Sequence, residues 1–231
     1  MSELSGRPRS AQDPRVGLTD PETLTGPRRA LYDAIAGGPR RQQRGQVPIA
    51  DEQGRLLGPF GLMLIAPEVG DAVQRLGAAL RFQSGLSPRV RELAILTVAV
   101  ATGCEFEWWA HEQAALAAGL DPAQLQSILD GSLPEGLTGA EREAARVCLA
   151  LAHRHRLDDD EYASAERTLG PVTLAELTWL VGYYSTLALA LAVFAPPSPA
   201  PSTEGQPSPS TGEQPSPSTG DQPDTSSRKP R

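Results

Sequence analysis

Residues 92–111 read ELAILTVAVATGCEFEWWAH, and the predicted fold and site both depend on this stretch. Its first half carries one carboxylate, Glu92, and is otherwise apolar nearly all round, which is the pattern of a central buried helix. A glycine interrupts this helix, and a second helix follows with Cys104, Glu107 and His111. These three stand at i, i+3 and i+7, so they share one helical face. The stretch therefore predicts two adjoining helices that carry a candidate site.

Helical patterns continue on both sides, and no run of alternating Val, Ile and Thr favours a sheet. Thr138-x-x-Glu141 reads as a capping box, and Gly170-Pro171 as the break between two helices. We predict an all-α fold, a single-domain orthogonal helical bundle of about eight or nine helices, over residues 25–195.

Two details of this prediction concern the chain before residue 90. Residues 56–60, LLGPF, read as a loop that enters the core. The helix expected from residue 67 to near residue 85 has one apolar side, formed by Val69, Val73, Leu76, Leu80 and Phe82.

The two ends of the chain are predicted to be disordered. Residues 1–24 form a polar N-terminal arm with Gly, Pro and charges of both signs. Residues 196–231 form a Pro/Ser/Thr-rich tail in which QPSPSTG occurs at 206–212 and again at 214–220. Such segments bury too little apolar surface to offset the entropy of ordering.

Composition restricts the partners and the location. The formal net charge is −7 and the pI is about 5.1, without a basic block, so nucleic acid is excluded as a partner. Only two cysteines occur, and no apolar run approaches the ~20 residues that span a bilayer. We therefore expect a cytoplasmic protein with no membrane partner. With no Gly-rich phosphate loop, we also expect no cofactor.

The carboxylates around His111 suggest proton chemistry. Glu107 and His111 stand at i, i+4, so the carboxylate can reach the imidazole, although such pairs are also common on solvated faces. Glu92 lies in apolar surroundings and must find a partner or become neutral. Its neighbour Arg91 is expected to point elsewhere on the helix. Cys104, Glu107 and His111 mix ligand types and lack a fourth ligand, so we expect no metal.

This combination resembles the carboxymuconolactone decarboxylase-like superfamily, which includes the alkylhydroperoxidase D-like proteins. The resemblance rests on residues 91–96 (RELAIL), 104–111 (CEFEWWAH), Ala114 and 119–120 (GL), and extends to 58–60 (GPF) and 182–184 (GYY). Glu92, Cys104 and His111 match the Glu, first Cys and His of the hydroperoxidase pattern. Glu107 stands where that pattern has its second cysteine, so the disulfide of a two-cysteine peroxidase cannot form.

The resemblance therefore implies the branch that does not use redox chemistry. In this branch a small carboxylated lactone or related organic acid loses carbon dioxide by acid–base chemistry. His111 would donate the proton, Glu107 would orient it, and Glu92 would act as a second carboxylate. The implied substrate-binding residues are Arg91, Trp108, Phe60 and Tyr183.

Two other functions are compatible with these residues. One is an alkylhydroperoxidase-type antioxidant that uses Cys104 and an external thiol. The other is a non-catalytic oligomeric binding protein that has kept the fold. For every alternative the resemblance implies a homo-oligomer, a trimer or hexamer, that binds a small molecule.

Overall fold

The computed structural model describes residues 14–38 and 48–198 of the 231-residue chain. Most of the predicted N-terminal arm (residues 1–13) and nearly all of the predicted tail (residues 199–231) lie outside these ranges. Within them there are eight α-helices, one short 3-10 helix and no strand beyond an isolated bridge between Ala50 and Leu56. The all-α fold is therefore confirmed.

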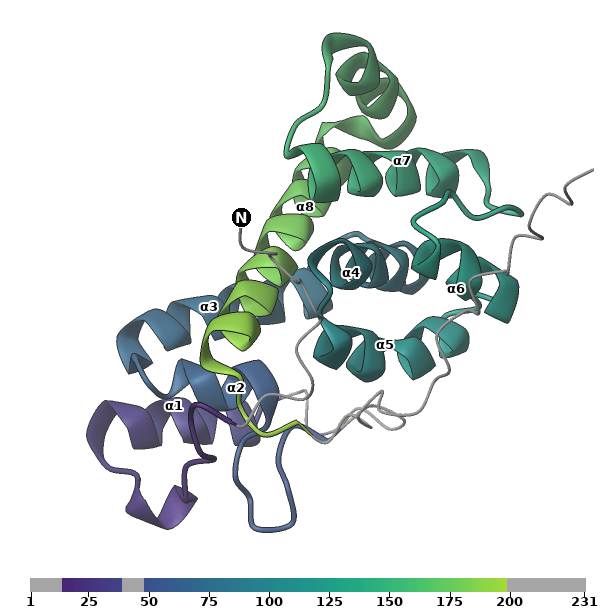
Figure 1. The fold of residues 1–231 in the computed structure, drawn as a ribbon. Coiled ribbons are helices and arrows are strands. Elements are labelled where there is room, and N and C mark those ends of the chain that lie inside the picture. Colours follow the sequence, from purple (N-terminus) through teal and green to yellow (C-terminus); the bar gives the residue numbers. More distant parts are fainter. Residues whose placement is uncertain (1–13, 39–47, 199–231) are drawn as a thin grey trace, which may run out of the picture. The chain divides into compact units, whose positions relative to one another are not determined.

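The elements follow one another along the chain as a series of helices (Figure 1). They are η1 (Pro21–Thr23), α1 (Gly26–Ala36), α2 (Gly58–Met63), α3 (Pro67–Phe82), α4 (Pro88–Thr102), α5 (Glu105–Ala117), α6 (Pro122–Leu129), α7 (Gly139–Arg154) and α8 (Asp159–Phe194).

Helix α4 lies at the centre of the core, as its apolar sequence predicts. It packs against α5, α6, α7 and α8, so residues on every side of it are covered. Eight consecutive residues, 92–99, are buried. The N-cap residue is Ser87, whose side-chain oxygen accepts a hydrogen bond of 3.2 Å from the Val90 N–H. This position places Glu92 well inside the bundle.

Helix α8 runs between two groups of helices, α2 and α3 on one side and α4 and α7 on the other (Figure 1). Its backbone leaves the helical conformation at Gly170, with φ 78° and ψ 162°, just before Pro171. The predicted break between two helices is thus confirmed as a kink, since glycine tolerates this positive φ.

Helix α8 is also long and apolar enough, by length and composition alone, to cross a membrane. Its place in the fold accounts for part of that composition. Ten of its residues, among them Leu177, Leu180 and Leu187, are buried in the domain. The core helix of a soluble domain meets the same length and composition criteria.

The predicted capping box at the start of α7 is present. Thr138 accepts a hydrogen bond from the Glu141 N–H, and the Glu141 carboxylate accepts one from the Thr138 N–H at 2.9 Å. Arg89 of α4 reaches the same carboxylate at 2.9 Å. The cap therefore also ties α7 to α4.

The prediction of a loop that enters the core at residues 56–60 is correct for the buried Leu56 and Leu57 but wrong from Gly58, where helix α2 starts. Gly58 has φ +52°, and a Cβ at this position would lie 2.2 Å from the Phe106 ring. The short helix depends on this close approach between distant parts of the chain, which local sequence does not show.

The predicted apolar side of α3 is also only partly correct. Leu80 is buried, but Val69, Leu76 and Phe82 are exposed. The helix instead packs closely through Gly70, where a Cβ would lie 2.2 Å from the Met63 carbonyl oxygen. Leu80 and Val73 therefore pack on the core, whereas the rest of the apolar stripe of α3 faces outward in the single chain.

Residues 14–24, which belong to the predicted arm, carry structure where they are described. They include η1, and Leu24 is buried against the core. The Arg15 N–H donates to the Ala195 carbonyl at 3.2 Å, so this segment lies beside the end of α8.

Candidate active site

The turn between α4 and α5 brings the predicted site together. Gly103 ends α4 in the left-handed conformation (φ 62°), and the Cys104 N–H donates to the Ala99 carbonyl at 2.8 Å. The chain reverses within these two residues, and α5 packs back along α4. Glu92 and His111, 19 residues apart in sequence, are thereby placed in contact.

His111 lies between two buried carboxylates. Its Nδ1 is 2.7 Å from Glu92 Oε2, and its Nε2 is 3.5 Å from Glu107 Oε2. The His111 side chain is 12% exposed, so water competes weakly for these contacts. The Tyr184 ring packs against the imidazole in a T-shaped contact, with ring centroids 5.3 Å apart. The imidazole is therefore held on three sides.

Glu92 lies among positive charges. Its Oε1 is 3.5 Å from Arg91 Nε and 3.7 Å from Arg81 Nη1. Burial opposes ionisation, but the His111 hydrogen bond and the charges of His111 and the two guanidiniums outweigh it and lower the pKa of Glu92. Glu92 is thus an ionised carboxylate at neutral pH.

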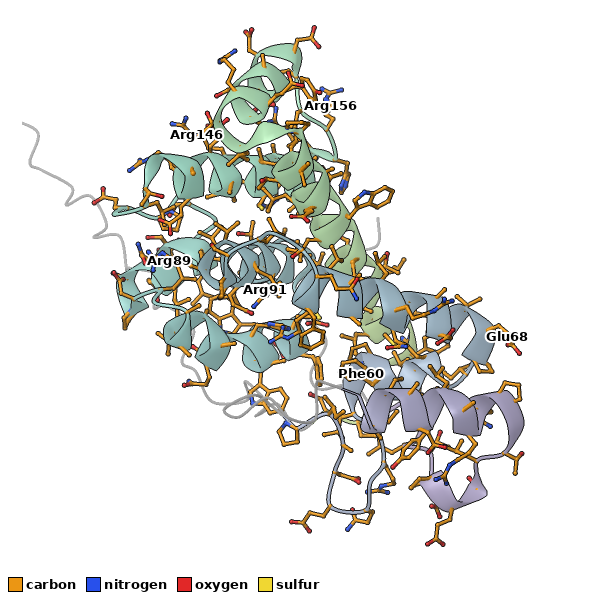
Figure 2. All side chains as sticks on the ribbon, turned by 180° about the vertical axis from the view of Figure 1, so that it is seen from behind. Phe60, Glu68, Arg89, Arg91, Arg146 and Arg156 are labelled. Carbon is orange, nitrogen blue, oxygen red and sulfur yellow. The ribbon has the colours of Figure 1, made fainter. Side chains whose placement is uncertain are left out.

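The expectation that Arg91 points elsewhere on the helix is wrong. Its Nε contacts Glu92, and its Nη1 donates to the Arg81 carbonyl at 3.3 Å. Figure 2 shows Arg91 among the helices, whereas Glu68 and Arg156 extend from the surface. Burial of Glu92 supplies the physical reason, because a buried carboxylate attracts the nearest flexible cation.

Glu107 has the opposite environment. Its side chain is buried, and within the described part of the chain its Oε1 has no hydrogen-bond partner. Burial raises the pKa of Glu107, and the charge of His111 only partly offsets this effect.

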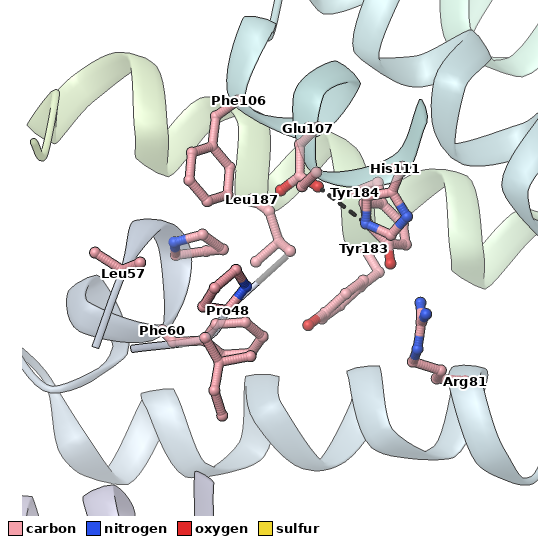
Figure 3. A pocket seen from close by; sticks show the side chains of 13 residues that line it. Pro48, Leu57, Phe60, Arg81, Phe106, Glu107, His111, Tyr183, Tyr184 and Leu187 are labelled. Atoms are coloured by element: carbon pink, nitrogen blue, oxygen red, sulfur yellow. Dashed lines mark ion pairs between the residues drawn. The ribbon is translucent and has the colours of Figure 1, made fainter. Parts of the chain in front are cut away.

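A small pocket of about 80 Å³ opens beside these groups (Figure 3). Helix α5 contributes Phe106, Glu107, Ala110 and His111. The other lining residues are Pro48, Ile49, Leu57, Pro59, Phe60, Arg81, Tyr183, Tyr184 and Leu187. Arg81 reaches the pocket from α3, and Glu107 from α5 lies at another part of its wall (Figure 3). The pocket thus combines aromatic walls with one guanidinium, one imidazole and one carboxyl group.

Of the predicted site residues, Glu107, His111, Phe60 and Tyr183 line this pocket, and Glu92 lies behind His111. Cys104, Arg91 and Trp108 are not among the lining residues. Trp108 packs instead against the second apolar cluster, which includes Leu93 and Leu96. The structure therefore brings together the histidine and both glutamates, places Cys104 and Trp108 outside the pocket lining, and places Arg91 behind it, against Glu92.

Cys104 is the N-cap residue of α5, and burial raises the pKa of its thiol to about 12. Cys148 is fully buried in the core on α7, where burial also raises its pKa to about 12. Both thiols are protonated at neutral pH, and a thiol is a far weaker nucleophile than a thiolate.

Sequence reasoning missed Arg81, Tyr184 and Phe106. Arg81 carries no motif, but its side chain is only 8% exposed because it faces Glu92. The requirement that a buried carboxylate has a cation nearby was the only signal for it. Tyr184 is adjacent to the predicted Tyr183, and Phe106 lies inside the segment 104–111.

A second, wider groove of about 560 Å³ lies between α7 and the first part of α8. Four of its charged residues pair with one another, Arg154 with Glu161 and Arg146 with Glu143. In the described ranges no group of three or more His, Cys, Asp or Glu side chains is placed to hold a metal ion. The pocket beside His111 is therefore the better candidate for chemistry.

Fold and site together define an all-α protein with a histidine–carboxylate pocket. Residues 67–150, from α3 through most of α7, match the model of the carboxymuconolactone decarboxylase family. This segment contains Arg81, Glu92, Glu107 and His111. This match supports, over this segment, the resemblance to the carboxymuconolactone decarboxylase/AhpD-like superfamily.

Solved structures show the same fold at low sequence identity. An uncharacterised peroxidase-related protein from Ralstonia eutropha JMP134 with an alkylhydroperoxidase AhpD core has TM-score 0.59 and 12% identity, covering 82% of this chain and 92% of its own. A proposed antioxidant defence protein AhpD from Agrobacterium tumefaciens has TM-score 0.54 and 19% identity, covering 60% and 95%. The debrominase Bmp8, in complex with 2,3,4-tribromopyrrole, has TM-score 0.55 and 12% identity, covering 74% and 84%. A search of curated proteins gives no match.

Proposed function

We propose that this protein is an acid–base enzyme of the superfamily, acting on a small carboxylated lactone or related organic acid. The observation that carries the proposal is the placement of His111. Glu92 holds one ring nitrogen at 2.7 Å, and the other ring nitrogen faces Glu107 at the pocket wall. A histidine fixed in this way is suited to transfer a proton to a bound substrate.

The hydrogen bond to Glu92 sets the tautomer of His111. An ionised carboxylate accepts from Nδ1–H, so the Nδ1 position keeps its proton. Nε2 is then the position that gains and loses a proton on the pocket side. Glu92 thus has the orienting role that the sequence prediction gave to Glu107.

Arg81 is suited to hold the carboxylate of such a substrate. It lines the pocket, and its guanidinium presents several donors in one plane. The aromatic rings of Phe60, Phe106 and Tyr183 favour a flat, partly apolar body. A volume of about 80 Å³ restricts the substrate to a small molecule.

A decarboxylation in this pocket can be written with all atoms accounted for. The bond between the substrate carbon and its departing carboxylate breaks, and its electron pair moves into a conjugated carbonyl group to give an enolate. Carbon dioxide leaves, and the His111 Nε2–H proton is transferred to carbon. The imidazole then regains a proton from solvent, so the net reaction consumes one proton and releases one carbon dioxide.

Peroxidase chemistry through Cys104 has less support from the site. The thiol lies outside the pocket lining, and its pKa is raised to about 12. The second cysteine of a disulfide cycle is replaced by Glu107. Cys148 lies in the core on another helix.

The experiment is a turnover assay that measures carbon dioxide release from 4-carboxymuconolactone and related lactone acids. We expect His111→Gln to lower kcat by about 10²–10⁴-fold while Cys104→Ser retains the wild-type rate. Full turnover by a folded His111→Gln protein would contradict the proposal. Peroxide turnover that Cys104→Ser abolishes would favour the antioxidant alternative, and binding without turnover would favour the binding protein.

We also propose that the protein forms a homo-oligomer in the cytoplasm. Helix α3 exposes Val69, at 65%, and α8 exposes Val172 and Trp179, at 70% and 65%. Exposed apolar side chains in such number are typical of surfaces that bury against another copy. Light scattering should give a trimer or hexamer mass, and Trp179→Glu should reduce it.

A further inference from the structure

We infer that Glu107 is a neutral carboxylic acid that donates a hydrogen bond to a carbonyl oxygen of the bound substrate. The inference deepens the proposed function, on which it rests, because it concerns the same pocket. It assigns Glu107 to the substrate instead of to the orientation of His111.

The first observation is the unpartnered oxygen of Glu107. The side chain is 3% exposed and lines the pocket, yet Oε1 has no hydrogen-bond partner among the described residues. The other oxygen, Oε2, is the one that faces His111 Nε2, at 3.5 Å. A buried polar atom without a partner is costly, so Oε1 is best explained as a group that binds a ligand.

The second observation is the distribution of charge around the two glutamates. Glu92 takes the short hydrogen bond from His111 and lies near two guanidiniums, those of Arg81 and Arg91. Glu107 instead faces His111 Nε2 at 3.5 Å, a longer distance than the 2.7 Å between His111 Nδ1 and Glu92. An ionised Glu107 would therefore be a second buried negative charge that shares His111 with Glu92, and its neutral form avoids this cost.

The other titratable neighbours of Glu107 do not supply a further cation. They are Cys104 on the same helix and the phenol of Tyr184 on α8, both of which interact with Glu107 electrostatically. Burial raises the pKa of each, so both are neutral. Burial likewise raises the pKa of Glu107 itself, which agrees with the neutral form.

The geometry then places the acidic proton. Oε2 faces His111 Nε2, whereas Oε1 has no partner among the described residues, so a proton carried by Oε1 is available to the pocket. A donor fixed in a site with little water stabilises negative charge that develops on a carbonyl oxygen, such as that of an enolate. With Arg81 holding a carboxylate, the site selects acids that also carry a carbonyl group.

Two probe molecules that differ only in the carbonyl group test this selection. They are 5-oxotetrahydrofuran-2-carboxylate, a lactone acid, and tetrahydrofuran-2-carboxylate, the same ring without the carbonyl. By calorimetry at pH 6, wild-type protein should bind the lactone acid at least about tenfold more tightly. Glu107→Gln retains a neutral donor and should keep this preference, whereas Glu107→Leu should lose it.

The protonation state is measured directly by infrared difference spectroscopy. The spectrum of wild type minus Glu107→Gln at pH 6 should contain the C=O band of a protonated carboxyl group. As pH rises through the raised pKa of Glu107, this band should disappear and lactone binding should weaken, whereas binding to Glu107→Gln should change little.

The inference is overturned if the band is absent, if wild type does not distinguish the two probes, or if Glu107→Gln loses the preference. If Glu107→Leu does not fold, the infrared band of the protonated carboxyl group and the lactone preference of Glu107→Gln still test the inference. None of these measurements requires turnover. Inactive protein that shows the band and the preference would refute only the lyase proposal, and active protein that lacks them would refute only this inference.

Discussion

The two sides of His111 carry the same residue type in opposite electrostatic environments. On the inner side, Glu92 is 2% exposed and lies near two guanidiniums, and its pKa is lowered. On the pocket side, Glu107 is 3% exposed and has one unpartnered oxygen, and its pKa is raised. Burial is nearly equal on the two sides, so it does not decide the charge.

The comparison shows that partners set the charge of a buried carboxyl group. Glu92 can remain ionised because cations from α3 and α4 and a hydrogen bond from α5 offset its desolvation. Glu107 lacks such cations and keeps one oxygen for the pocket. One histidine can therefore have a fixed anion on one side and a neutral donor on the other, a division of roles that suits proton transfer.

The largest expected effect is on stability when Glu92 loses its charge. Glu92→Gln leaves the poorly exposed Arg81 and Arg91 without their carboxylate, and removing one partner from a buried ion pair costs about 3–5 kcal/mol. Urea unfolding at pH 7 should show this loss. The matched control is Glu107→Gln, which we expect to cause no loss of stability, because Gln is neutral and avoids the cost of keeping a carboxyl group protonated at pH 7. Equal losses in both variants would remove the contrast between the two sides.

The next effect is the pH dependence of stability, which should have opposite sign for the two glutamates. The ordinary pKa of both is 4.5, and that of Glu92 is lower in the folded protein. Its stabilising contribution is therefore present above pH 4.5 and is lost as pH falls through the folded pKa. The pKa of Glu107 is higher in the folded protein, so its contribution is lost as pH rises from 4.5 through the folded value.

Unfolding measured from pH 3 to 8 for wild type and both variants checks these signs. The stability difference between wild type and Glu92→Gln should shrink on the acid side. The difference between wild type and Glu107→Gln should change in favour of the variant as pH rises, by up to about 1.4 kcal/mol per pH unit. A parallel pH profile for the two differences would contradict the opposite pKa shifts.

Parts of the fold and of the site were predictable because their sequence signals are local. The break at Gly170-Pro171 and the capping box at Thr138 are short-range backbone chemistry, and the structure contains both. The approach of Glu107 to His111 follows from helical spacing.

The rest depended on contacts between distant segments. Arg81 reaches Glu92 only because α3 packs near the start of α4, and no motif marks it. Helix α2 begins where Gly58 passes close to Phe106, 48 positions further along the chain. The inward direction of Arg91 followed from burial of Glu92, which a helical-wheel argument does not include.

The smallest expected effect is on the reactivity of Cys104, which lies near Glu107 and therefore bears on the comparison of the two glutamates. Its pKa of about 12 leaves a thiolate fraction on the order of 10⁻⁵ at pH 7, against about 3% for an ordinary thiol. In a Cys148→Ala background, alkylation of folded protein by iodoacetamide should be correspondingly slow.

Burial is the main cause of that raised pKa, and the negative charge of Glu107 adds to it. If Glu107 is neutral near pH 6, Glu107→Gln should leave the alkylation rate unchanged there. Above the folded pKa of Glu107 the wild-type carboxylate disfavours the thiolate, so the variant should react faster, by about two- to tenfold. The pH at which the two rates separate then reports the ionisation of Glu107 through a neighbouring group. Separation already at pH 5 would mean that Glu107 is ionised like Glu92, and the two sides of His111 would then be electrostatically alike.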